Sequence, residues 1–184
     1  LQSYCIRDKG FKTSKRPVAV PEDAPETIRR MGEVAALVGV GPMFTFPGAL
    51  AEHVGRTLAR SLPEVTVVNG GDTYAVTRRP SKLTVYRREG QALSVVIRPE
   101  QGPAGVYTTE GSLLTAADSA DAVVVVADSC VLADAVAAAV LAILSHPRSF
   151  AQALRLLRTT AGVRGGIVVR DERIGLAGHV ELAA

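Results

Sequence analysis

The spacing of apolar residues divides the chain into a helical first part, a strand-rich middle and a mixed end. Residues 1–24 show no period and are expected to form a partly ordered leader. Pro25 is typical of a first helical turn, and apolar positions recur at helical spacing after it, which predicts a helix over residues 26–38. A second helix is predicted over residues 47–62, with an apolar stripe at Leu50, Val54, Leu58 and Leu62.

Short segments rich in β-branched residues follow and are separated by turn-forming residues. Strands are predicted at residues 65–68, 73–77, 83–87, 93–98, 106–109 and 121–127. The run Asn69, Gly70, Gly71, Asp72 between the first two strands is a strong hairpin signal, because glycine adopts the positive φ angles of tight turns. Successive short strands joined by tight turns indicate an antiparallel sheet.

Two helices and a hairpin complete the pattern. An alanine-rich helix is predicted over residues 129–144, another over 149–160, and a hairpin over 166–170 and 173–176. Small side chains allow a sheet or another helix to approach the long helix closely, at Ala135, Ala138, Ala139 and Ala142. The pattern predicts one α+β domain, residues 25–184, in which an antiparallel sheet packs against long helices.

Composition narrows the class of protein. Hydrophobic residues make up 47% of the chain and charged residues 21%, as in folded globular proteins. The net charge of +3 comes from basic clusters without interleaved aromatic residues, which argues against nucleic acid and favours either a solvated face or attraction for a phosphorylated small molecule. The most apolar stretch, residues 120–144, argues against a membrane span because it is interrupted by Asp121, Asp128 and Asp134.

The cysteines and the first residues predict the compartment. Cys5 lies in a polar segment and Cys130 in an apolar one, so a disulfide between them is not expected. The absence of a disulfide predicts a reducing, cytoplasmic location. The first ten residues contain no apolar run, so no secretory leader is expected. The chain begins at Leu1 without a methionine, which indicates a fragment or a processed chain.

Asp134 is the most informative candidate for chemistry. Its neighbours at helical spacing are Cys130, Val131, Ala137 and Ala138, none of which can pair with a carboxylate. A buried carboxylate without a partner costs several kcal/mol unless a donor, a cation or a metal comes from elsewhere in the fold. The alternative is that Asp134 faces water near the start of its helix. The residues alone leave both interpretations open.

The glycine turn is the second candidate site. Gly70 and Gly71 allow the backbone between Asn69 and Asp72 to approach a phosphate or a flavin closely, although an ordinary hairpin turn needs the same residues. Thr108 and Thr109 end a predicted strand and either line a site or close a turn. The histidines and cysteines lack the spacing of a zinc site.

Eight segments in order resemble the ApbE-like superfamily, whose better-known members are FAD:protein FMN transferases. They are VGPM at 40–43, PGALAE at 47–52, NGGD at 69–72, GVYTTEG at 105–111, ADAV at 120–123, LADA at 132–135, GGI at 165–167 and GHVEL at 178–182. The match covers residues 25–182 and is to the short prokaryotic branch of the superfamily.

The resemblance implies cofactors, partners and roles. It places Asp134 and Ala138 in a magnesium site, and Asn69, Gly70, Gly71, Asp72, Thr108 and Thr109 beside the flavin nucleotide. The implied function is magnesium-dependent binding of a flavin nucleotide, with transfer of FMN from FAD to a hydroxyl of an acceptor protein left open. The alternative is a non-catalytic accessory role in sulfide assimilation and homocysteine formation.

Several departures from the family pattern bear on that choice. The branch usually has a Gly-His step after the equivalent of Gly111, where this chain has Leu113 and Leu114 and no histidine. The missing histidine weakens the case for transfer more than the case for binding. Phe44 and Phe46 stand where the family has small residues, and they serve either as anchors of a homodimer or as core filling.

Overall fold

The computed structural model describes residues 2–86, 92–109, 120–146 and 148–183. Its helices are α1 (Gln2–Arg7), α2 (Lys9–Thr13), α3 (Glu26–Val38), η1 (Pro42–Thr45), α4 (Phe46–Leu58), η2 (Pro99–Gln101), α5 (Cys130–Leu144) and α6 (Phe150–Thr159). Its strands are β1 (Val65–Asn69), β2 (Asp72–Val76), β3 (Ser81–Tyr86), β4 (Ala92–Ile97), β5 (Ala104–Thr108), β6 (Ala122–Ala127), β7 (Val163–Arg170), β8 (Arg173–Gly178) and β9 (Leu182–Ala183).

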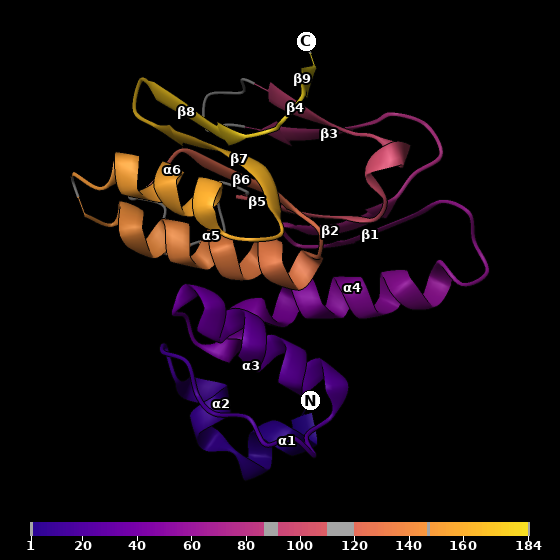
Figure 1. Cartoon of the computed structure of the whole chain (residues 1–184), viewed down its shortest axis with the longest axis vertical. Helices are drawn as coiled ribbons and strands as arrows, with labels where there is room; N and C mark the ends of the chain where they lie inside the picture. The colour runs from indigo at the N-terminus through magenta and orange to yellow at the C-terminus, as the bar shows by residue number, and fades with distance from the viewer. Residues whose placement is uncertain (1, 87–91, 110–119, 147, 184) are drawn as a thin grey trace.

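The strands form two antiparallel sheets. The larger has six strands in the order β1-β2-β5-β6-β7-β8, and the smaller has three in the order β3-β4-β9. Figure 1 shows the smaller sheet over one face of the larger, with α4, α5 and α6 over the other and α3 beyond them. The predicted α+β fold with antiparallel sheet against long helices is confirmed. Its division into two sheets was not predicted, because period-two alternation within a strand does not tell which sheet the strand joins.

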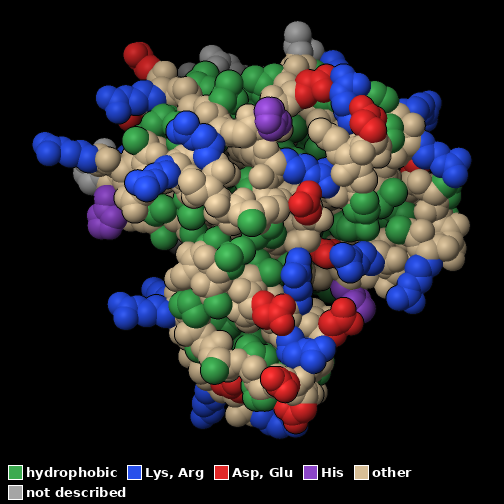
Figure 2. All heavy atoms as spheres, viewed as in Figure 1, with side chains coloured by type: hydrophobic (Ala, Val, Ile, Leu, Met, Phe, Trp, Pro, Cys, Tyr) green, Lys and Arg blue, Asp and Glu red, His purple; other side chains and the backbone are tan. Residues whose placement is uncertain are grey.

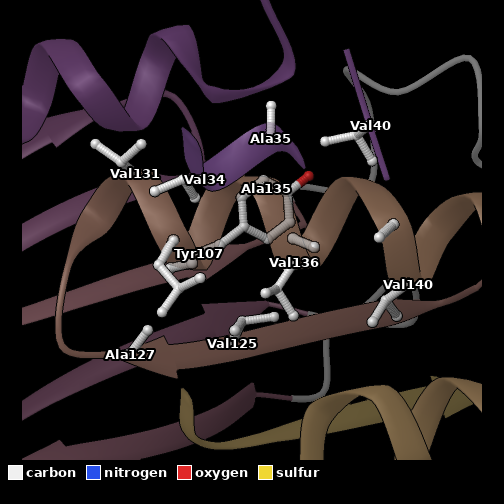
Figure 3. Close-up of a cluster of buried hydrophobic side chains, with 14 of the residues drawn as sticks. Val34, Ala35, Val40, Tyr107, Val125, Ala127, Val131, Ala135, Val136 and Val140 are labelled. Atoms are coloured by element: carbon white, nitrogen blue, oxygen red, sulfur yellow. The ribbon is translucent and has the colours of Figure 1, made fainter. Parts of the chain in front are cut away.

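Both faces of the larger sheet are covered, which explains the unbroken apolar run of its central strand. All six residues of β6 are buried. Val124 and Val126 pack with Val95 and Ile97 of the smaller sheet, while Val123 and Val125 belong to the core beneath the helices. Figure 3 shows Val125 in that second core, together with Val136 of α5. A strand with two covered faces lacks the polar alternation of a half-exposed strand.

The apolar stripe on α4 does not face the core. Leu50, Val54, Leu58 and Leu62 are 38–49% exposed, and α4 ends at Leu58 rather than at residue 62. The buried face instead carries small residues and one carboxylate, namely Gly48, Ala49, Ala51, Glu52 and Gly55. A Cβ at Gly55 would collide with the ring of Tyr74 on β2, so the helix lies too close to the sheet for larger side chains. Close backbone packing, rather than side-chain hydrophobicity, selects the buried face here.

The first 24 residues were predicted to be a partly ordered leader, and part of this segment packs on the core. Phe11 of α2 is fully buried and lies edge-on to Tyr4, with ring centroids 5.2 Å apart. A Cβ at Gly41 would collide with the carbonyl oxygen of Ser14, so the segment also approaches the loop after α3 closely. Helices of six and five residues are too short to show a period in the sequence. The boundary at residue 24 stays a prediction.

The two phenylalanines of the loop before α4 differ in exposure. Phe44 is 44% exposed, whereas Phe46 packs against the main core. The homodimer contact stays a prediction that rests on Phe44. In the described ranges no single helix is long and apolar enough to cross a membrane. The pair formed by α3 and residues 42–58 meets the length and composition of a membrane span, but it is bent by 106°. Basic and acidic side chains are interspersed on the face in Figure 2.

Candidate functional site

Asp134 lies in the second turn of α5 and is buried. The helix begins after Ser129, whose side chain accepts a hydrogen bond from the backbone N–H of Leu132 at 3.2 Å. The Asp134 side chain is 5% exposed, and its Oδ2 accepts a hydrogen bond from the backbone N–H of Gly48 at 2.9 Å. The tight approach depends on Gly48, because a Cβ there would lie 2.5 Å from the Cys130 carbonyl oxygen. Of the two interpretations left open by the sequence, the solvent-facing one is excluded.

A second buried carboxylate, Asp72, faces the same layer from the sheet. It begins β2 directly after the turn and is 2% exposed. In the antiparallel register Asp72 stands opposite Tyr107 of β5, so the two side chains share a face of the sheet. Tyr107 packs into the core that includes Ala135 and Val136 of α5 (Figure 3). Asp72 therefore points toward α5, and its Oδ1 has no hydrogen-bond partner among the described residues.

Burial and nearby negative charge raise the pKa values of several groups in this layer. Burial raises the pKa of Asp72 well above its usual range, and the nearby charge of Asp134 raises it further. Burial also raises the pKa of Asp134, against the opposing effect of the Gly48 N–H bond. The pKa values of Tyr107 and Cys130 are raised by burial first and then by both carboxylates. These shifts define one buried acidic cluster under the start of α5.

The predicted glycine turn lies beside this cluster. Gly70 has a φ of 62°, which favours glycine, and connects β1 to β2. The Asn69 side-chain amide donates to the Pro47 carbonyl at 3.1 Å, so the turn is attached to the start of α4. The Gly71 carbonyl accepts from the Thr108 backbone N–H at 2.8 Å and from its hydroxyl at 3.3 Å. The fold thus brings together four of the residues that the resemblance placed near a nucleotide, in addition to Asp72.

Two other predicted site residues lie in less favourable positions. Thr109 is buried, and its hydroxyl oxygen accepts the backbone N–H of Val123 at 2.8 Å, so it fixes the β5–β6 region. Ala138 is half-buried, one turn after Asp134. It has no side-chain ligand atom, and its carbonyl lies inside a helix where carbonyls accept the helix's own N–H groups. Gly111 and the Leu113–Leu114 pair lie outside the described residues.

Sequence reasoning missed Glu52, which fixes the start of α5. Its side chain comes from α4 and is buried, and its Oε2 accepts the backbone N–H groups of Cys130 and Val131 at 2.8 and 3.3 Å. The other oxygen pairs with Arg56 at 3.1 Å. A carboxylate at a helix N-terminus satisfies free N–H groups and the positive end of the helix dipole. Only the Glu52–Arg56 spacing was visible in the sequence, and it is typical of a solvent-exposed helix face.

The chemistry available to the cluster follows from its composition. Ionised carboxylates are hydrogen-bond acceptors only, so the pair must either share a proton or bind a cation. Within the described part of the chain, no group of three or more His, Cys, Asp or Glu residues could hold a metal ion. Asp72 and Asp134 would therefore contribute two carboxylates, and the rest of a metal's coordination shell would come from other oxygens, such as backbone carbonyls, water or a ligand.

Comparisons with known proteins show the family and the fold of this chain. Residues 1–156 match the family model described as AbpE bacteria. A UPF0280 protein of Methanopyrus kandleri is 36% identical over 97% of this chain and 76% of its own length, and one of Methanosarcina acetivorans is 27% identical over 98% and 74%. The apo crystal structure of the Pseudomonas stutzeri flavinyl transferase ApbE matches 77% of this chain with a TM-score of 0.53 at 16% identity, which shows a shared fold. The present chain spans about half of that transferase, 48% of its length.

Proposed function

Because this chain belongs to the AbpE bacteria family, we propose that it binds a flavin nucleotide in a magnesium-dependent manner at the cluster around Asp134. The observation that carries the proposal is the buried carboxylate pair, in which Asp72 Oδ1 has no hydrogen-bond partner among the described residues and Asp134 Oδ2 accepts a bond from the Gly48 N–H. Such a pair favours a cation, because each buried negative charge is costly without one. Magnesium fits these residues because it prefers oxygen ligands.

The chain's own residues would hold the nucleotide as follows. Asp134 would bind the cation, and the Gly48 N–H bond fixes the orientation of its carboxylate. Gly70 has open space where a side chain would stand, so a flavin or phosphate can approach the turn closely there, whereas the position beside Gly71 is occupied by the Thr108 carbonyl. When bound, magnesium supplies positive charge that offsets the pyrophosphate of FAD and the charge of a leaving AMP. Thr108 holds the turn in place through its two bonds to Gly71.

Transfer of FMN is the further step within this proposal. The hydroxyl oxygen of an acceptor protein attacks the FMN phosphorus, the pyrophosphate bond breaks, AMP leaves and the hydroxyl proton passes to a base. The missing histidine after Gly111 leaves no residue of the family pattern there for that proton. Binding of the nucleotide is therefore the primary activity proposed, and transfer is secondary.

The test is a calorimetric titration of FAD into wild type and Asp134→Asn, with and without magnesium. We expect the variant to lose at least tenfold in magnesium-dependent affinity, about 1.4 kcal/mol, because Asn cannot supply a charged ligand. It should also lose stabilisation by magnesium in thermal melting. Chromatography of the same mixtures for released AMP distinguishes transfer or hydrolysis from binding alone.

Asp171→Asn is the matched control, since Asp171 is exposed in the β7–β8 turn at a φ of 54°, a conformation that Asn accepts well. It should bind FAD as wild type does. If Asp134→Asn and wild type respond equally to magnesium, the metal role of Asp134 is refuted. If wild type binds neither FAD nor metal, the accessory role in sulfide assimilation is the better interpretation.

A further inference from the structure

We propose that Asp72 is the second metal ligand of this site, so that the cation is bound between strand β2 and helix α5. The inference rests on the function proposed above and changes the ligand set: the resemblance paired Asp134 with Ala138 and placed Asp72 beside the nucleotide. Two carboxylates from different layers would then hold the cation. This ligand set replaces the pair implied by the resemblance, which is one carboxylate and one position inside a helix.

The direction of the Asp72 side chain supports this assignment. Asp72 shares a sheet face with Tyr107 and, two residues along the same strand, with Tyr74. Tyr74 packs against Ala51 of α4 and Cys130 of α5, and Tyr107 against the middle of α5. Asp72 therefore lies under the helical layer, on the side from which Asp134 approaches. The electrostatic effect of Asp134 on Asp72 is consistent with this proximity.

Burial and hydrogen bonding exclude the simpler roles for Asp72. A surface turn carboxylate would be solvated, but Asp72 is 2% exposed. A structural carboxylate would accept N–H or O–H groups at both oxygens, but Oδ1 accepts none among the residues described. Direct contact of an ionised Asp72 with the phosphates of a nucleotide is unfavourable, because the carboxylate repels phosphate and has no donor to offer. A small cation is the partner that fits both observations.

The same reasoning disfavours Ala138 as a ligand. Its carbonyl belongs to the interior of α5, which runs on to Leu144, and would have to leave a helical hydrogen bond to bind metal. Asp72 needs no such change. A pair of hard oxygen ligands also predicts selectivity, namely tighter binding of Mg²⁺ and Mn²⁺ than a site built from His and Cys would give, and no strong preference for Zn²⁺.

The experiment measures Mn²⁺ alone, without nucleotide, by electron paramagnetic resonance of free Mn²⁺ during titration. The proteins are wild type, Asp72→Asn, Asp134→Asn, the double variant and the Asp171→Asn control, each checked for folding by circular dichroism in EDTA. We expect each single site variant to bind Mn²⁺ at least tenfold more weakly than wild type. The double variant should lose little beyond the singles, because the two residues act on one ion.

The outcomes separate this inference from the proposed function. If Asp134→Asn weakens Mn²⁺ binding and Asp72→Asn does not, the inference is overturned and the proposed function stands. If wild type binds no Mn²⁺ at millimolar concentration, both fail. A second measurement on wild type covers the case in which Asp72→Asn does not fold: Mn²⁺ should broaden the amide NMR signals of Gly71, Asp72 and Thr73 as strongly as those around Asp134. Broadening confined to α5 would contradict a ligand on β2.

Discussion

Glu52 offers the sharpest test of how the site is held in place. It lies on α4 but caps α5, since its Oε2 accepts the N–H groups of Cys130 and Val131. Glu52→Ala removes both bonds and leaves two buried N–H groups without their acceptor. Glu52→Gln retains an acceptor oxygen and removes the charge. Arg56→Gln is the matched control. It removes the ion-pair partner of Glu52, and the Arg56 side chain is 65% exposed.

The expected magnitudes follow from these contacts. A hydrogen bond to a charged group contributes about 1.5–3 kcal/mol, and the 3.3 Å bond to Val131 is the weaker of the two, so Glu52→Ala should cost about 3 kcal/mol. Glu52→Gln loses mainly the interaction of its charge with the α5 dipole, about 1 kcal/mol. Arg56→Gln removes one largely exposed ion pair and should cost under about 1 kcal/mol.

The assay is urea unfolding of the metal-free protein, followed by circular dichroism and fitted for the free energy of unfolding. The predicted order of destabilisation is Glu52→Ala, then Glu52→Gln, then Arg56→Gln. If Glu52→Ala costs no more than Arg56→Gln, the carboxylate does not cap α5, and water or another group satisfies those N–H groups. A change in the slope with urea would indicate an altered denatured or native state, and the comparison would then use melting temperatures.

Two further predictions concern the site and the core. In metal-free protein kept in EDTA, burial raises the pKa values of Asp72 and Asp134 in the folded chain above the value near 3.9 that an unfolded chain has. The stability that their protonation contributes is therefore fully present below about pH 4 and is lost as pH rises through the raised pKa values. Between pH 4 and pH 9 the free energy of unfolding should therefore decrease more for wild type than for the variant with Asn at both positions. If the two proteins show the same dependence on pH, the raised pKa values are contradicted. Ala139 is 6% exposed in the main core, so Ala139→Leu should lower the unfolding free energy by about 1–3 kcal/mol, whereas an unchanged thermal midpoint would show room around α5.

Local patterns predicted most of the secondary structure. Residues 26–38 form the predicted helix with the same bounds, ended by Gly39 at a φ of 78°. The Asn69–Asp72 turn and the final hairpin also lie where turn chemistry predicts them. These elements are determined by interactions among residues close in sequence, namely helical spacing, caps and tight turns, which a single sequence displays directly.

Packing between distant segments decided the rest. The sequence pointed to Asp134 because nothing near it in the helix could be its partner, but only the fold shows that it is buried and held by Gly48. The apolar stripe of α4 is not the buried face, because helix, sheet and α5 approach so closely that glycine and alanine occupy the contact. Glu52 was missed because its partners are N–H groups of another helix.

The sequence by itself thus determined most of the elements, their order and the antiparallel character of the sheet. The tertiary structure decided which faces are buried, that the strands divide into two sheets, and that Asp72 and Asp134 converge in one acidic cluster. The physical reason is the range of the interactions. Hydrophobic period and turn preference act over a few residues, whereas burial, close backbone approach and electrostatic coupling arise only when distant segments meet, as Gly48 and Asp134 do across 86 residues, and a local pattern does not show such contacts.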